Sequence, residues 1–136
     1  MIARSRCSLA LLALLVACGH AKPAPATPPK VDTAALAAEL DAQQAELALV
    51  LHRDRAECAA LAANLKALFA RMSATMTRAR EATKDPAVAK ALTTDLKRYD
   101  AAAAQRGAQM DADVTPDAPC IHDQAVRDTL VTMPTL

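Results

Sequence analysis

The stretch DTAALAAELDAQQAELALVLHRDRAECAALAANLKALFARMSATMTRAREATK, residues 32–84, decides the fold of this chain. It contains neither glycine nor proline, and most of its residues favour helix. Its apolar residues recur three, four or seven positions apart, which places them on one face of a helix. Because the phase of this pattern does not slip, the stretch predicts one continuous helix over residues 32–84. The face consists of Leu40, Leu47, Leu51, Cys58, Leu61, Leu65, Leu68, Met72, Met76 and Ala79.

Clear signals mark both ends of this helix. Asp32 or Thr33 can cap its free amides, and Pro86 disfavours helical geometry at Asp85. Aspartate followed by proline is also a common helix start. The sequence therefore predicts a second, antiparallel helix over about 86–110 and a short third helix over about 121–132. The predicted class is all-α, a helical hairpin with an added short helix.

The composition predicts a thin hydrophobic core. Apolar residues make up 53% of the chain, yet there is no Trp, one Phe and one Tyr. Alanine supplies most of the apolar fraction, and alanine removes little area from water. A chain of this kind needs a further source of stability, such as a disulfide.

Cys58 and Cys120 are the predicted disulfide. From Cys58 to the turn at Pro86, and back along the second helix, the chain covers roughly 37 Å each way at 1.5 Å per residue. This path returns the chain to the level of Cys58 just before Cys120. The bond would close the base of the hairpin.

The first half of the long helix has no partner in this scheme. If the second and third helices cover only the part after Cys58, residues 33–55 keep an apolar stripe exposed to water. We expect this stripe to pair with a second copy or with an envelope protein as a coiled coil. The alternative is a bend near residues 52–55 and a four-helix bundle. The predicted partner-binding face is Leu36, Leu40, Leu47 and Leu51.

Two polar residues interrupt this stripe. Gln44 and Asp54 stand where apolar residues would continue the pattern. Polar residues in such a position lower stability and can set register or oligomeric state. They indicate contacts between helices rather than chemistry.

The N-terminus has the parts of a secretory signal, namely early arginines, a short apolar run and a small residue. The run ends in Leu15-Val16-Ala17-Cys18, which resembles the lipobox of bacterial lipoproteins. The resemblance implies cleavage before Cys18 and a lipid on its thiol. Because Gly19 rather than aspartate follows, it also implies the outer membrane, with the protein facing the periplasm. No family is indicated for the rest of the chain.

The predicted organisation has three parts. Residues 1–17 form the signal peptide, and residues 18–31, rich in proline and alanine, form an extended tether. Residues 32–136 form the helical domain. The tether would hold this domain a little away from the membrane.

The sequence contains no recognisable catalytic motif. It has no Gly-rich loop, no Gly-x-Ser-x-Gly and no His-Glu-x-x-His, and the helical part holds only two histidines, His52 and His122. His52 and Cys58 lie six residues apart on a helix and so point in different directions. We therefore predict no catalytic residue, no metal and no cofactor. The methionines are interpreted as flexible core residues rather than copper or haem ligands.

The formal charge of the chain is +1, so clustered basic residues for nucleic-acid binding are not indicated. The resulting hypothesis is a lipid-anchored envelope protein that acts as a helical interaction or structural module without catalysis. Its partners would be the membrane, through the lipid, and either a second copy or an envelope protein. The alternative is a periplasmic helical bundle that binds a small ligand, haem or metal.

Overall fold

The computed structural model describes residues 30–135, and this part of the chain is helical with no strand. The predicted all-α class is thus confirmed. Residues 1–29, with the predicted signal peptide, Cys18 and nearly all of the tether, lie outside the described part. Among the described helices, none has the length and apolar character needed to cross a membrane. The helices are α1 (Thr33–Asp54), α2 (Cys58–Ala82), α3 (Pro86–Leu96), the 3₁₀ helix η1 (Lys97–Tyr99), α4 (Asp100–Asp113) and α5 (Gln124–Leu130).

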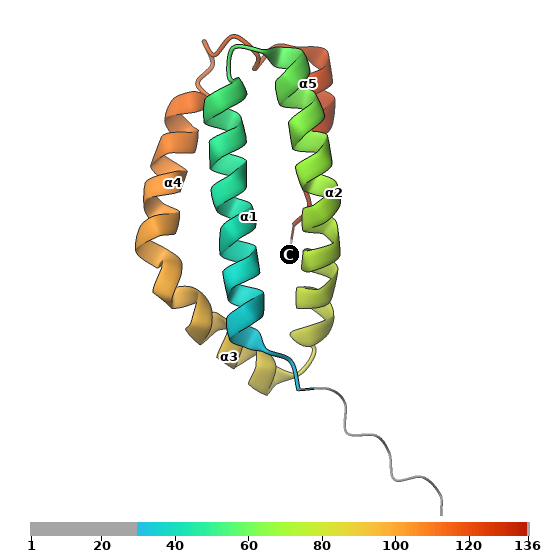
Figure 1. Cartoon of the computed structure of the whole chain (residues 1–136), viewed down its shortest axis with the longest axis vertical. Coiled ribbons are helices and arrows are strands. Elements are labelled where there is room, and N and C mark those ends of the chain that lie inside the picture. Colours follow the sequence, from blue (N-terminus) through green and yellow to red (C-terminus); the bar gives the residue numbers. More distant parts are fainter. Residues whose placement is uncertain (1–29, 136) are drawn as a thin grey trace, which may run out of the picture.

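The prediction of one continuous helix over residues 32–84 is wrong. The chain reverses at residues 55–57, and α1 and α2 pack side by side (Figure 1). The amide of Glu57 donates to the carbonyl of Asp54 at 2.8 Å, which closes the turn. Interrupting the helix loses a few hydrogen bonds of about 1 kcal/mol each, whereas each leucine that becomes buried contributes roughly 1.5–3 kcal/mol. Folding the stripe onto itself is therefore favoured, and the four-helix alternative describes the arrangement.

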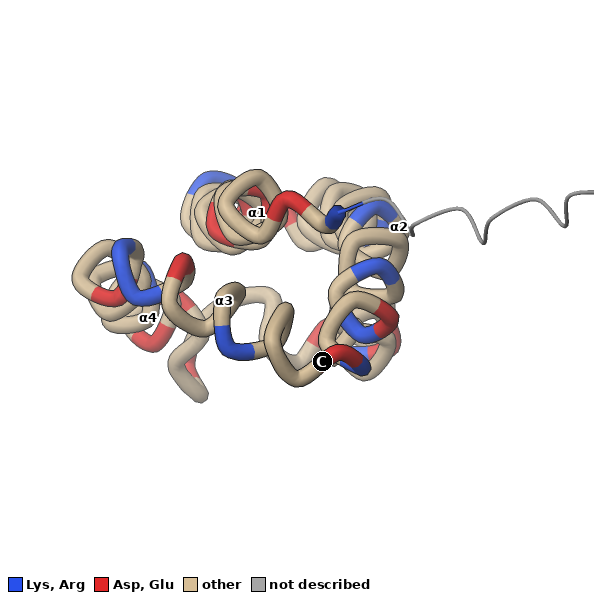
Figure 2. The backbone as a smooth tube through the Cα atoms, turned by 90° about the horizontal axis from the view of Figure 1, so that it is seen from below, with Lys and Arg blue, Asp and Glu red and all other residues tan. Residues whose placement is uncertain are grey.

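Helix α1 lies at the centre of the bundle. It packs against α2 on one side and α4 on the other, and α3 crosses below it (Figures 1 and 2). The predicted second helix therefore returns along α1 rather than along α2. It is divided into α3, η1 and α4 and extends to Asp113, while the predicted third helix is the shorter α5, packed on α2.

The core consists of two apolar clusters. The larger one joins α1, α2 and α5, and it includes Leu47, Leu51, Leu65, Leu68 and Val126. The smaller cluster lies at the other end of α1 and joins Leu36, Ala37, Ala79 and Leu92.

The expected partner-binding face is not bare in this structure. Leu36, Leu47 and Leu51 are 7–8% exposed, and Leu40 is partly buried against the smaller cluster. They are covered by α2, α3 and α4 of the same chain. The expectation that residues 33–55 lack an internal partner is wrong, because the turn at residues 55–57 brings α2 onto them.

The two polar residues in the stripe make contacts between helices. Asp54 is buried at the turn, where its carboxylate accepts two hydrogen bonds from Arg53 at 2.7 Å and one from Asn64 of α2 at 2.8 Å. The Arg53 guanidinium and the Asn64 amide lower the pKa of Asp54 to about 2. Gln44 accepts a hydrogen bond of 3.3 Å from Arg106 of α4. Both residues thus fix how helices of one chain meet.

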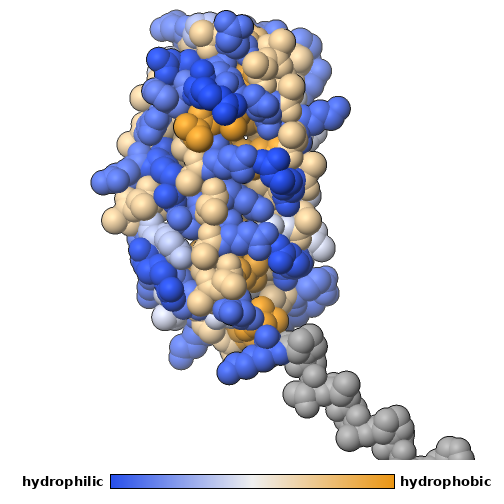
Figure 3. All heavy atoms as spheres, viewed as in Figure 1, coloured by the Kyte–Doolittle hydropathy of each residue, from blue (hydrophilic) through white to orange (hydrophobic). Residues whose placement is uncertain are grey.

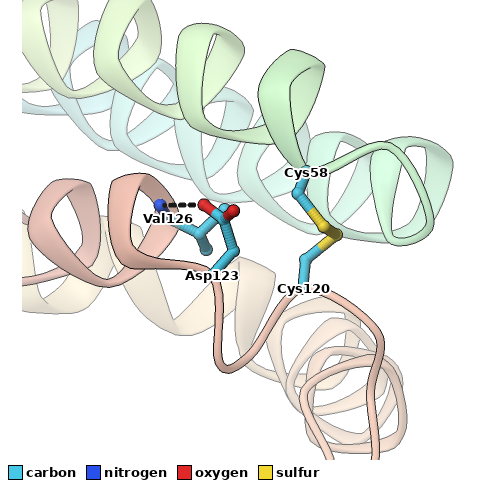
Figure 4. Close-up of a disulfide and its surroundings, with 4 residues drawn as sticks. All are labelled: Cys58, Cys120, Asp123 and Val126. Carbon is cyan, nitrogen blue, oxygen red and sulfur yellow. Dashed lines mark hydrogen bonds between the residues drawn. A yellow bond between two sulfur atoms is a disulfide. The ribbon is translucent and has the colours of Figure 1, made fainter.

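The predicted disulfide between Cys58 and Cys120 is present (Figure 4). The two Cα atoms are 5.1 Å apart, across 62 residues of sequence. Cys58 begins α2, and Cys120 lies in the loop before α5, where the Asp123 carboxylate caps the helix by accepting from the Val126 amide at 3.0 Å. The chain returns to the level of Cys58 as predicted, because α3, η1 and α4 together run back along the bundle over the length of α2.

We expect loss of the disulfide to destabilise the fold by roughly 4 kcal/mol, because the bond closes a long loop in the unfolded chain. The test is urea unfolding of Cys58→Ala, Cys120→Ala and the double variant, each compared with the oxidised protein. The single variants should lose as much as the double variant, since either one removes the same cross-link. Mass spectrometry under non-reducing conditions that found both thiols free in periplasmic protein would contradict the assignment.

We also expect Asp54 to contribute stability that depends on pH. Its pKa is about 2 in the folded protein and lies near 3.8 when the chain is unfolded. A lowered folded pKa means that the contribution is complete above about pH 5 and disappears as pH falls towards 2. Asp54→Asn should reduce the free energy of unfolding by about 1–2 kcal/mol at pH 7 and by much less near pH 2.5.

The measurement is urea unfolding at both pH values. Asp117→Asn, in the exposed loop before Cys120, is the matched control and should follow the wild type at each pH. A deficit of Asp54→Asn that stays the same at pH 2.5 would contradict the assignment.

Candidate functional site

The two histidines of the described residues bind different partners. His52 lies at the end of α1, with Nδ1 3.0 Å from the Asp113 carboxylate, and His122 lies in the loop before α5, with Nε2 3.1 Å from the Pro116 carbonyl. Between residues 30 and 135, no group of three or more His, Cys, Asp or Glu side chains is placed to hold a metal ion. Both cysteines of this region are joined in the disulfide.

A groove of about 440 Å³ runs between α1, α2 and the returning α3–η1–α4 segment. We call it the methionine groove. Viewed from below, α1 lies between α2 and α4, and α3 lies opposite α1 (Figure 2). The groove is lined by Leu40, Asp41, Gln44, Leu47, Met72, Met76, Leu96, Tyr99, Asp100, Ala103, Met110 and Met133.

Four of the five methionines of the chain line this one groove, and the fifth is Met1. Met72 and Met76 are four residues apart and so share one face of α2. Met110 comes from α4. Met133 comes from the C-terminal tail, which runs back along α2 (Figure 1).

The four side chains differ in burial. Met72 is 6% exposed and belongs to the larger core cluster, and Met76 and Met110 are partly buried against that cluster. These three agree with the predicted core role. Met133 is 45% exposed and is not among the residues packed against either cluster. The tail is held beside α2 by a hydrogen bond of 2.6 Å from Arg80 to the Thr135 carbonyl.

The charged residues that line the groove are all acidic. They are Asp41 of α1 and Asp100 of α4, and no Lys, Arg or His is among the lining residues. The carboxylate of Asp41 is paired with Arg106, which joins α4 to α1 with both side chains less than one-fifth exposed. The groove thus combines apolar and thioether walls with a negative rim.

A second groove, of about 510 Å³, lies between the start of α1 and the end of α2. Glu39, one of its polar lining residues, is held by two neighbouring side chains. Thr75 donates to the Glu39 carboxylate at 2.7 Å, and Arg78 also pairs with Glu39. The hydrogen bond from Thr75 and the charge of Arg78 keep the pKa of Glu39 below its ordinary value. These groups link α1 to α2, so the second groove is the weaker candidate.

The outer surface offers no large apolar patch on the face that Figure 3 shows. That face is mainly hydrophilic, with small apolar areas between the helices. Among the described residues, the exposed large apolar side chains are Val31, Leu49, Val131 and Met133. Scattered exposure of this kind is ordinary for a soluble surface.

The comparisons with known proteins add no relative. No family model, curated protein or solved structure matches this chain. The candidate site therefore rests on its own residues.

Sequence reasoning found part of this site. The methionines of α2 were placed in the apolar face, but their meeting with Met110 and Met133 was not predicted. The acidic lining residues Asp41 and Asp100 were not singled out either. Nothing in the local pattern around them indicates a groove, because it depends on how the returning segment and the tail lie against α1 and α2.

Proposed function

We propose that this protein is a lipid-anchored, non-catalytic module of the bacterial envelope that binds a small ligand in the methionine groove. The observation that carries the proposal is the groove itself. It is walled by α1, α2, the returning α3–η1–α4 segment and the C-terminal tail, and it is lined mainly by apolar and thioether side chains with a few polar groups. Small-molecule sites in proteins have this size and character.

Ligand binding is preferred here over an interaction module. The interaction hypothesis depended on an exposed stripe in residues 33–55. Leu36, Leu47 and Leu51 of that stripe are buried by the chain's own helices. The described surface therefore gives no reason for a second copy or a protein partner at that face.

Haem is a poor fit to the groove. Neither His52 nor His122 is among the lining residues, and the rim carries Asp41 and Asp100 rather than basic residues. Haem propionates are anionic and would meet these carboxylates. A neutral or cationic ligand suits the groove better.

The membrane is the proposed partner through the lipid on Cys18. This part of the proposal depends on the lipobox resemblance of Leu15-Val16-Ala17-Cys18, which implies a periplasm-facing position, at the outer membrane because Gly19 follows. The binding domain would then stand at the end of a proline-rich tether. Ligand capture close to a membrane fits a protein without catalytic residues.

We expect Ala103→Phe to weaken ligand binding at least about tenfold, because its ring would fill part of the groove. The measurement is fluorescence titration with N-phenyl-1-naphthylamine, a neutral apolar probe. The protein is residues 19–136 exported to the periplasm, which contains both core clusters and the disulfide. Ala35→Phe, the same change in the second groove, is the matched control.

The control variant should bind the probe as the wild type does, within a factor of about two. Equal weakening by both substitutions, or no binding by the wild type, would contradict the proposal. Melting temperatures of both variants show whether either change disturbs the fold.

We expect Cys18→Ser to abolish lipid attachment, because serine has no thiol to carry the diacylglycerol. The measurement is incorporation of labelled palmitate by cells producing the full chain. Cys7→Ser, which changes the other cysteine of the predicted signal peptide region, is the matched control and should leave labelling intact. Labelling that persists in Cys18→Ser would contradict the lipobox assignment.

A further inference from the structure

Every thioether in the part of the chain that the structure describes faces one groove. The described residues hold six sulfur atoms, two in the disulfide and four in Met72, Met76, Met110 and Met133. These four come from α2, from α4 and from the tail. Residues that are distant in the sequence but share the thioether group thus line the same groove.

Core packing explains this arrangement only in part. Methionine fills irregular gaps in a core, which suits Met72. Met133 is 45% exposed and lies on a segment outside the helices. Met133 thus adds a solvent-accessible thioether to the three others that line the same groove.

Thioether sulfur is a soft, neutral ligand. Among first-row metals it favours Cu(I) and binds the harder Mg²⁺, Ca²⁺ and Mn²⁺ poorly. Cu(I) has a filled d shell and imposes little geometry, so it accepts donors from several flexible side chains. Met72 and Met76 lie one helical turn apart, about 6 Å along α2, which long methionine side chains can bridge to one ion.

The charge of the groove favours a cation. Asp41 and Asp100 are the charged lining residues of the groove. Arg106 compensates Asp41 from α4, which leaves the carboxylate of Asp100 at the rim. The negative charge of Asp100 would therefore attract a monovalent cation that neutral sulfur atoms hold in the groove.

We propose that the methionine groove binds Cu(I) through the thioethers of Met76, Met110 and Met133, with Met72 at its buried side. This inference rests on the proposed function and names the ligand class of the same groove. It does not involve either histidine or the disulfide. The binding is reversible coordination and changes no oxidation state.

The test is competition for Cu(I) against bicinchoninate under anaerobic conditions, with ascorbate keeping copper reduced and the disulfide intact. The protein is residues 19–136 from the periplasm. The variant Met76→Leu, Met110→Leu, Met133→Leu keeps size and apolar character while removing three soft donors. We expect it to bind Cu(I) about 100-fold or more weakly than the wild type. The double variant His52→Gln, His122→Gln should bind within a factor of about two of the wild type.

The naphthylamine titration separates this inference from the proposed function. The leucine variant should melt near the wild-type temperature, so that its loss of Cu(I) binding does not reflect unfolding. Probe binding without Cu(I) binding by the wild type overturns the copper site and leaves the groove as a ligand site. Absence of both overturns both proposals.

Two other results also overturn the copper site. One is Cu(I) binding that is unchanged in the leucine variant. The other is equal binding of Zn²⁺ in the same groove, because thioethers alone would discriminate against it.

Discussion

The whole fold depends on the burial of α1 from two sides. One face of this alanine-rich helix meets α2 after the turn at residues 55–57, and another meets the returning α3 and α4. With one Phe, one Tyr and no Trp, the chain has few large side chains with which to build a core. It achieves burial by placing other helices on two sides of α1, and the resulting layer of packed side chains is narrow.

A narrow core makes covalent and polar links between helices more important. The Cys58–Cys120 disulfide connects the start of α2 to the loop before α5, and Asp54 and Asn64 connect α1 to α2 at the turn. Arg106 connects α4 to α1 through Asp41 and Gln44. Asp54 and Gln44, the polar residues that interrupt the apolar stripe, therefore make defined contacts between helices. Each fixes the relative placement of two helices that leucine and alanine alone would leave free to slide.

Local signals in the sequence were enough to predict the ends of several helices and the disulfide. Asp32 and Asp85 cap their helices as expected, each accepting from a backbone amide of the first turn. The turn at residues 55–57 could not be predicted in the same way, because Arg55, Ala56 and Glu57 all suit a helix interior. The turn forms because packing the two halves of the apolar stripe against each other stabilises the fold more than the backbone hydrogen bonds of a continuous helix would. The methionine groove is even less predictable from local sequence, because it depends on the path of α4 and on the position of the C-terminal tail.

The disulfide also sets a direction along the bundle. It lies at the end where α1 turns into α2, whereas the start of α1, the α2–α3 junction and the smaller cluster lie at the other end (Figure 1). The disulfide keeps the chain segments beside it joined, whereas the far end is held by non-covalent contacts, which include the smaller cluster and the hydrogen bond from Thr33 to Asp95. Resistance to opening therefore declines along the long axis. The end where α1 begins therefore opens more easily, and the methionine groove lies between the two ends.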